Sequence, residues 1–156
     1  MLVSRRPILE RRRGAAMVEA AIILPILAMF IFGLITGAMG IFYYQRVATL
    51  AREGARWASV RGGHFEFEER VPAATPQQVY QAAILPLTVG LNTDALTYTV
   101  TWAGGADKSP IYLAVPASNT WRRNHVRVTV SYQWTPLTRY FSPMTLRSTS
   151  RMPITY

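Results

Sequence analysis

The sequence predicts an α+β fold, in which one long N-terminal helix continues into a small domain built on an antiparallel sheet. An uncharged and mostly apolar stretch runs from Ala20 to Gln45. Small and apolar residues then recur at helical spacing up to residue 58, and apolar and polar residues alternate in three later segments. The chain has 156 residues, which is room for one such helix and one small domain.

The uncharged stretch is long enough to cross a membrane. Its 26 residues make a helix of about 39 Å, whereas the hydrocarbon core of a bilayer is about 30 Å thick. A secretory signal has only about 7–15 apolar residues, and no small-x-small site closes a shorter one here. We therefore expect a transmembrane helix over residues 15–45 that stays in the protein. The alternative is a buried helix of a soluble core.

Arginines flank the expected span on both sides. Five precede Gly14, against the single acid Glu10, and four follow the span by residue 61, against the single acid Glu53. The N-terminal tail is denser in arginine and directly abuts the apolar run, which favours its retention in the cytoplasm. A domain of about 110 residues crosses largely regardless of its charge, so we expect it outside.

Several residues of the span carry expectations of their own. Pro25 removes a backbone donor and is expected to kink the helix. Gly33 and Gly37 have the spacing that lets two helix backbones approach closely, although this motif is weak when it stands alone. Tyr43 and Tyr44 fit an aromatic belt at the outer membrane interface.

Beyond the span, the helix is expected to continue outside the membrane over residues 46–62. Gly62 and Gly63 are expected to end it, because glycine readily adopts the left-handed conformation that closes many helices. The residues that form one small and apolar face, against which a sheet or another helix can lie close, are Val47, Leu50, Ala51, Gly54, Ala55 and Ala58.

Residues 63–156 are expected to form the outer α+β domain. Thr75 fits an N-cap and is followed by proline, which predicts a short helix over residues 76–85. Alternating patterns predict strands over residues 97–102, 126–134 and 145–154. Pro153 gives the last strand an edge or end position. Residues 104–119 are expected to be irregular.

The sequence offers little for catalysis. His64 stands near three glutamates, at positions 66, 68 and 69, but this set has one nitrogen ligand and fits no metal motif. A polar loop with Phe65 and Phe67 turned inward explains it better. His125 fits a surface or capping position. The chain has no cysteine, no P-loop and no Gly-x-Ser-x-Gly. We expect no catalytic residue, no metal, no cofactor and no enzymatic activity.

The junction before the span is the most informative part of the chain. The string Arg12-Arg13-Gly14-Ala15-Ala16-Met17-Val18-Glu19 leads directly into Ala20-Ala21-Ile22-Ile23-Leu24-Pro25. It resembles the start of TadE-like pseudopilins, which are minor subunits of the tight-adherence, or Flp-type, branch of type IV pilus systems. Members of that family often carry an aromatic residue after the glutamate, where this chain has Ala20.

The resemblance covers roughly a third of the chain. It extends to about Gly62 and includes the string Ala51-Arg52-Glu53-Gly54-Ala55-Arg56. It implies a pilin-like shape and a cytoplasmic leader over residues 1–14. It also implies a membrane-embedded prepilin peptidase, which cuts after Gly14 and leaves Ala15 as the new N-terminus.

The function implied by the resemblance is assembly of an adhesive Flp-type pilus. The chain is then a minor pilin or pseudopilin that passes once through the bacterial cytoplasmic (inner) membrane and enters a cell-surface pilus or stays at its base. The implied partners are the prepilin peptidase, other pilins and pseudopilins, the pilus assembly platform and the lipid bilayer.

Glu19 fits an assembly role on physical grounds. An ionisable group at the edge of a span usually marks a function or a partner. If Ala15 becomes the terminus, its amino group has a pKa of about 7.7–8.0 and is largely protonated at neutral pH. Glu19 then lies one helical turn away and pairs with its own terminus or with that of a neighbouring subunit. The simpler reading is a helix N-terminal charge in the headgroup zone.

Two alternative functions stay open. One is a membrane scaffold of the pilus machine that is never cleaved. The other is a DNA-binding pseudopilin, since basic and aromatic residues interleave at Trp121, Arg122, Arg123 and Arg127. Loss of the leader leaves a formal net charge of +5, from 12 basic and 7 acidic residues. The cluster is short, and a basic face near anionic lipid explains it as well, so nucleic acid is not favoured as a partner.

Overall fold

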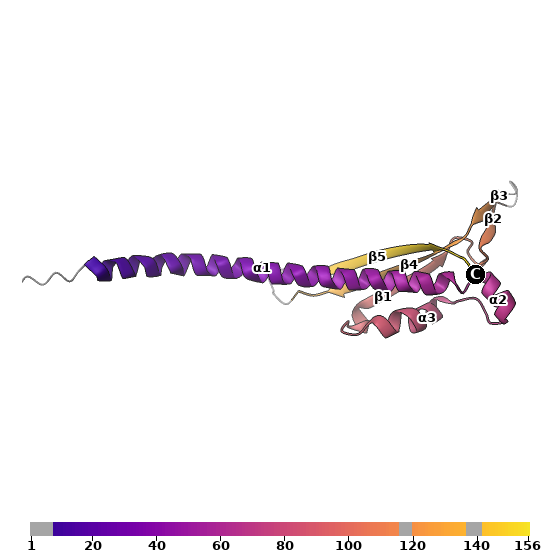
Figure 1. The fold of residues 1–156 in the computed structure, drawn as a ribbon, viewed down its shortest axis with the longest axis horizontal. Coiled ribbons are helices and arrows are strands. Elements are labelled where there is room, and N and C mark those ends of the chain that lie inside the picture. The colour runs from indigo at the N-terminus through magenta and orange to yellow at the C-terminus, as the bar shows by residue number, and fades with distance from the viewer. Residues whose placement is uncertain (1–7, 116–119, 137–141) are drawn as a thin grey trace, which may run out of the picture. The chain divides into compact units, whose positions relative to one another are not determined.

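The computed structural model describes residues 8–115, 120–136 and 142–156 (Figure 1). It confirms the predicted α+β class. A long helix, α1 (Ile8–Ser59), is followed by a small antiparallel sheet of three strands. Pro25 lies inside α1. The chain divides between Met39 and Gly40 into two compact units, and α1 contributes to both. We call the second, Gly40–Tyr156, the C-terminal unit.

The three-stranded sheet follows the predicted strands closely. Its strands are β1 (Leu96–Trp102), β4 (His125–Trp134) and β5 (Met144–Pro153), in the order β1-β4-β5. Both pairings are antiparallel, with Val128 opposite Val100 on one side and opposite Ser150 on the other. The alternation of β4 puts every second side chain from Val126 to Trp134 in the core.

The core of the C-terminal unit lies between this sheet and the last part of α1. The predicted small and apolar face of the helix is buried there, from Val47 to Ala58. A Cβ added at Gly54 would lie 3.2 Å from Val128 Cγ1 and 3.3 Å from Ile84 Cγ1. The helix therefore approaches the sheet closely because position 54 has no side chain.

Helix α1 ends at Ser59, three residues before the expected Gly62. Gly62 has a φ of −91°, so it does not supply a left-handed closure. It is needed for close approach instead, since an added Cβ would lie 2.5 Å from the Tyr156 carbonyl oxygen and 2.6 Å from that of Lys108. The Gly62 amide donates to the Tyr156 carbonyl at 2.9 Å, which fixes the C-terminal segment beside the helix end.

A short helix, α2 (Gly63–Glu69), replaces the loop expected after α1. Arg70 closes it in the left-handed conformation, with a φ of 55°. Phe65 is half-buried, as expected. The expectation that Phe67 also turns inward is wrong, because its side chain is 86% exposed.

The predicted helix after Thr75 is present but changes its winding. Helix α3 (Pro76–Val79) passes into a π-helical segment, η1 (Tyr80–Ile84), and a 3₁₀ turn, η2 (Leu85–Leu87). Thr75 is the N-cap: its hydroxyl oxygen accepts the Gln78 amide at 3.3 Å, and Gln78 Oε1 accepts the Thr75 amide at 2.9 Å. This reciprocal capping box satisfies two donors at the helix start.

The expectation of an irregular stretch over residues 104–119 is wrong for part of it. Strands β2 (Ile111–Val115) and β3 (Thr120–Arg123) form a separate antiparallel pair. A 3₁₀ turn, η3 (Thr93–Ala95), precedes β1. Asn124 joins the two sheets and is fully buried. Its Oδ1 accepts the Gly104 amide at 2.9 Å and its Nδ2 donates to the Asp107 carbonyl at 2.7 Å.

Candidate functional site

The N-terminal half of α1 exposes an apolar surface that water does not favour. Within the described residues, one helix segment, Gly14–Ser59, is long and apolar enough to cross a membrane. The chain buries none of the most apolar part of this segment. A buried helix of a soluble core would cover these side chains. The long exposed helix fits a single-pass membrane protein.

The residues of the predicted cleavage junction lie on this exposed helix. Gly14, Ala15 and Glu19 are all exposed. Ala15 and Glu19 are four residues apart in α1, so the helix brings them to one side, one turn apart. A Cβ added at Gly14 would meet no atom within 4 Å, so packing within the chain does not require a glycine there.

Gly33 and Gly37 are in the same situation. An added Cβ at either position would meet nothing within 4 Å. Their spacing in α1 keeps them on one side of the helix, one turn apart. The nearby Thr36 hydroxyl donates to the Phe32 carbonyl at 2.8 Å, which satisfies this polar group inside the apolar stretch.

Two of the three acidic residues near His64 have structural partners. Glu66 Oε2 accepts the Ala73 amide at 3.3 Å, and Glu68 Oε2 accepts the Tyr156 hydroxyl. Among the residues that the structure describes, no three His, Cys, Asp or Glu side chains are grouped so that they could hold a metal ion.

Lys108 is the only lysine of the chain and fastens two segments together. Its Nζ donates to the Ala74 carbonyl at 2.8 Å and lies 4.6 Å from the centre of the Trp102 ring. Burial lowers the pKa of Lys108 below its ordinary value, and the nearby Glu66 carboxylate partly opposes that shift by favouring the charged amine.

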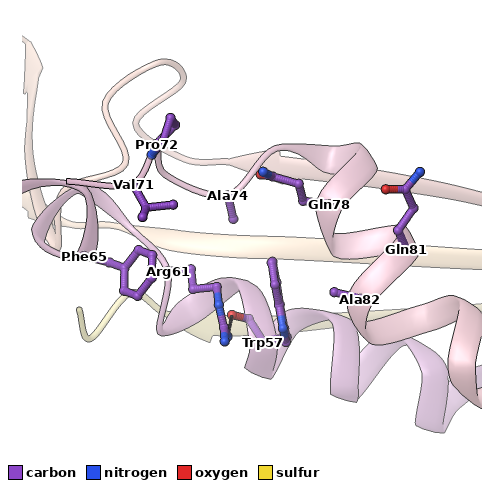
Figure 2. A pocket seen from close by; sticks show the side chains of 9 residues that line it. All are labelled: Trp57, Arg61, Phe65, Val71, Pro72, Ala74, Gln78, Gln81 and Ala82. Atoms are coloured by element: carbon purple, nitrogen blue, oxygen red, sulfur yellow. Dashed lines mark hydrogen bonds between the residues drawn. The ribbon is translucent and has the colours of Figure 1, made fainter. Parts of the chain in front are cut away.

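A groove of about 240 Å³, which the sequence did not predict, lies between the end of α1 and the segment that leads into α3 and η1 (Figure 2). The Arg61 guanidinium lies 4.2 Å from the centre of the Trp57 ring and 5.8 Å from that of Phe65. The other lining residues are Val71, Pro72, Ala74, Gln78, Gln81 and Ala82. These nine residues include no carboxylate, histidine or hydroxyl, so they supply neither a nucleophile nor a general base.

The basic and aromatic cluster considered for DNA is divided between the two sheets. Trp121, Arg122 and Arg123 are exposed on β3, whereas Arg127 lies on β4. Successive side chains of a strand point to opposite faces, so Arg122 faces away from Trp121 and Arg123. Arg122 therefore does not share a face of β3 with Trp121 and Arg123.

Comparison with known families gives a match that falls on the long helix. Residues 14–56 match the family described as TadE-like protein. A search of curated proteins and a search of solved structures found no match. The matched segment begins at Gly14 and ends three residues before the end of α1. The N-terminal helix of this chain is therefore similar to that of TadE-like proteins, and the similarity stops before the end of α1.

Proposed function

We propose that this protein is a minor pilin or pseudopilin, which is cut after Gly14 by a prepilin peptidase and takes part in assembly of an adhesive Flp-type pilus. The observation that carries the proposal is the coincidence of three boundaries. The TadE-like match begins at Gly14, the exposed apolar helix follows it, and five arginines precede it. The role is structural and not enzymatic.

Gly14 suits a cleavage site inside a helix. A peptidase binds its substrate in an extended form, so the helix has to unwind locally around the scissile bond. Glycine is less favourable than alanine in a helix by about 1 kcal/mol, so the helix unwinds more readily at Gly14 than at the alanines that follow it. Since nothing in the chain packs against position 14, the small residue is explained by a partner that needs access to the backbone.

Cleavage gives Glu19 its role. The new amino group of Ala15 is positively charged at neutral pH, and a lone carboxylate at the membrane edge is unfavourable. The exposed position of Glu19 leaves it accessible to the terminus of a neighbouring subunit. We propose that this pairing sets the axial register of subunits, while Gly33 and Gly37 allow adjacent helices to approach.

The proposed topology follows from the charge and size of the two ends. The arginine-rich leader stays in the cytoplasm, and the C-terminal unit lies outside the inner membrane. There it supplies lateral contacts in the pilus or a surface for adhesion. The partners in this scheme are the peptidase, other pilins and the assembly platform.

The proposal is tested by identifying the N-terminal residue of the protein isolated from membranes of its own host. Mass spectrometry of the terminal peptide should find Ala15 in the native protein and an uncut leader in Gly14→Leu. Gly33→Leu is the matched control, because both glycines are open in the chain, and it should be cut normally. A native protein that keeps its leader would overturn processing and support the uncleaved scaffold.

A further inference from the structure

Two elements meet at the end of the C-terminal unit that is continuous with the apolar stretch. An added Cβ at Gly40, the first residue of this unit, would lie 3.3 Å from the Trp134 ring, at the end of β4. The Tyr43 ring stacks on Tyr132, with ring centres 5.8 Å apart. The helix and the end of the sheet are therefore packed together where the unit begins.

A tight turn is fastened at the same end. The Leu91 amide donates to the Thr88 carbonyl at 2.8 Å, and Gly90 has a φ of 83°, the left-handed value that such a turn requires. Arg46 Nη2 donates to the Val89 carbonyl at 2.7 Å, which ties the turn to α1. Arg46 lies six residues after Gly40, about 9 Å along the helix.

Apolar side chains at this end are exposed. Val89, at the tip of the turn, is 77% exposed. Met144 opens β5 opposite Trp134 and is 45% exposed, and Tyr44 on α1 is 49% exposed. A turn tip is ordinarily polar or glycine. An exposed valine there, at the same end of the unit as an exposed methionine and an exposed tyrosine, is unfavourable in water and favours an apolar or interfacial environment.

We propose that Val89, Met144 and Tyr44 form a membrane-contacting rim, by which the folded unit rests in the headgroup and upper acyl region of the bilayer. The argument for lipid as the occupant is continuity. The rim lies at the end of the C-terminal unit that begins at Gly40, and the exposed apolar stretch directly precedes Gly40 in the chain, so this end of the unit is the one joined to the proposed span. The inference rests on the proposed membrane anchoring and adds that the domain itself touches lipid.

The length of the span agrees with this position. A helix from Ala20 to Gly40 has 21 residues and a length of about 31 Å, close to the roughly 30 Å of hydrocarbon. The excess of the uncharged stretch, residues 41–45, then lies at the interface. Aromatic side chains such as Tyr44 are enriched at that depth, and an arginine such as Arg46 suits the phosphate level.

Single-cysteine labelling tests the rim, because the native chain has no cysteine. An environment-sensitive fluorophore is attached to Val89→Cys, Met144→Cys or Phe67→Cys in the full-length protein. The protein is reconstituted into phosphatidylethanolamine–phosphatidylglycerol vesicles that contain lipid spin-labelled near the glycerol backbone or at mid-chain. Phe67 is the matched control, since it is exposed and follows the end of α1, about 29 Å of helix beyond Gly40. Leu27→Cys reports insertion of the span.

If the rim contacts lipid, the fluorophores at positions 89 and 144 should show a blue-shifted emission in vesicles. Lipid spin-labelled near the glycerol backbone should quench both, and the fluorophore at position 67 should show neither change. Deep quenching at position 27 without quenching at 89 and 144 would overturn the rim and leave the anchoring intact. Absence of quenching at position 27 would overturn the anchoring as well. A blue shift at 89 and 144 that grows with the protein-to-lipid ratio, without quenching by lipid, would assign the surface to a second copy and overturn the lipid contact.

Discussion

Glu19 is the residue whose chemistry is hardest to explain within one isolated chain. It is exposed at the start of a helix stretch that is otherwise apolar, and the residues one turn away on α1, at positions 15, 16, 22 and 23, carry no charged side chain. A carboxylate in such a place is energetically unfavourable unless it pairs with a positively charged group. The proposed partner is the amino group of Ala15, which exists only after cleavage. Cleavage and assembly should therefore depend on different residues.

Replacing Glu19→Gln should separate these two steps. The amide keeps the shape of the side chain but cannot pair with a charged amine, so the leader should still be removed while incorporation into the pilus is lost. The measurement is the terminal peptide together with the share of the protein in sheared pilus fractions. Glu69→Gln, an exposed acid on α2, is the control and should assemble normally. Normal assembly of the Glu19 variant would contradict the register role.

Lys108 allows a prediction about pH. Burial lowers its folded pKa below the ordinary 10.5, against the opposing effect of Glu66. Between the folded pKa and 10.5 the unfolded chain binds more protons, so the free energy of unfolding should rise with pH in that window. At lower pH both states are charged, and this contribution is constant.

Because Lys108 is the only lysine, lysine-selective isotope labelling gives a single side-chain amine to follow by NMR. Its titration midpoint should fall below 10.5 in the folded protein and return to that value in denaturant. A Glu66→Gln variant should lower the midpoint further, since it removes the charge that favours the ammonium. A folded midpoint at or above the denatured one would contradict burial as the dominant effect.

At the scale of elements, the capping box carries the short helical segment α3–η1–η2. The α-helical part is only Pro76–Val79, which is too short to be stable by propensity alone. Thr75→Ala removes the acceptor for the Gln78 amide and should lower the free energy of unfolding by about 1 kcal/mol. Chemical denaturation of the detergent-solubilised protein measures the change. Gln77→Ala, an exposed neighbour in the same helix, should have little effect, and equal losses in both variants would refute the cap.

Elements with a regular pattern were predictable, and elements fixed by distant contacts were not. The alternation in β4 and the Thr75–Pro76 start each reflect local chemistry. Strand β2 is an unbroken apolar run after Pro110, without the alternation of a half-buried strand. Such a run, bounded by prolines, is still compatible with a strand, so a signal was present. Helix α2 has no side-chain cap at its start, so the sequence lacks the usual signal for the beginning of a helix.

The same distinction applies to the sites. Gly14 and Glu19 stand in one short string, so the sequence alone was enough to propose them. The rim depends on Val89, which lies beside α1 because Arg46, 43 residues earlier, holds its carbonyl. The groove at Arg61 depends in the same way on segments that meet only after folding. The spacing of residues along the chain therefore does not predict the contact between Arg46 and Val89 or the groove at Arg61.

At the scale of the whole molecule, α1 belongs to two environments. Its second part completes the core of the C-terminal unit, where Val47, Leu50 and Ala51 are at most 1% exposed. The same segment of α1 lies close to β4 at Gly54 and Val128, and Val126, Val128 and Val130 of β4 are fully buried. Burial of one valine or leucine contributes about 1.5–3 kcal/mol, whereas a domain has only about 5–15 kcal/mol of net stability. Loss of this helix segment would therefore remove most of the net free energy of unfolding of the unit.

Two fragments test this dependence. Residues 40–156 keep the helix segment and should fold and unfold cooperatively, with tertiary signals in near-ultraviolet circular dichroism. Residues 63–156 contain the whole sheet but lack α1, and they should show neither signal because β4 would expose its apolar face. Both fragments are studied in the same mild detergent, so that exposed apolar surface does not decide the outcome by aggregation. Cooperative unfolding of the shorter fragment would mean that the sheet has a sufficient core of its own, and that α1 serves the membrane alone.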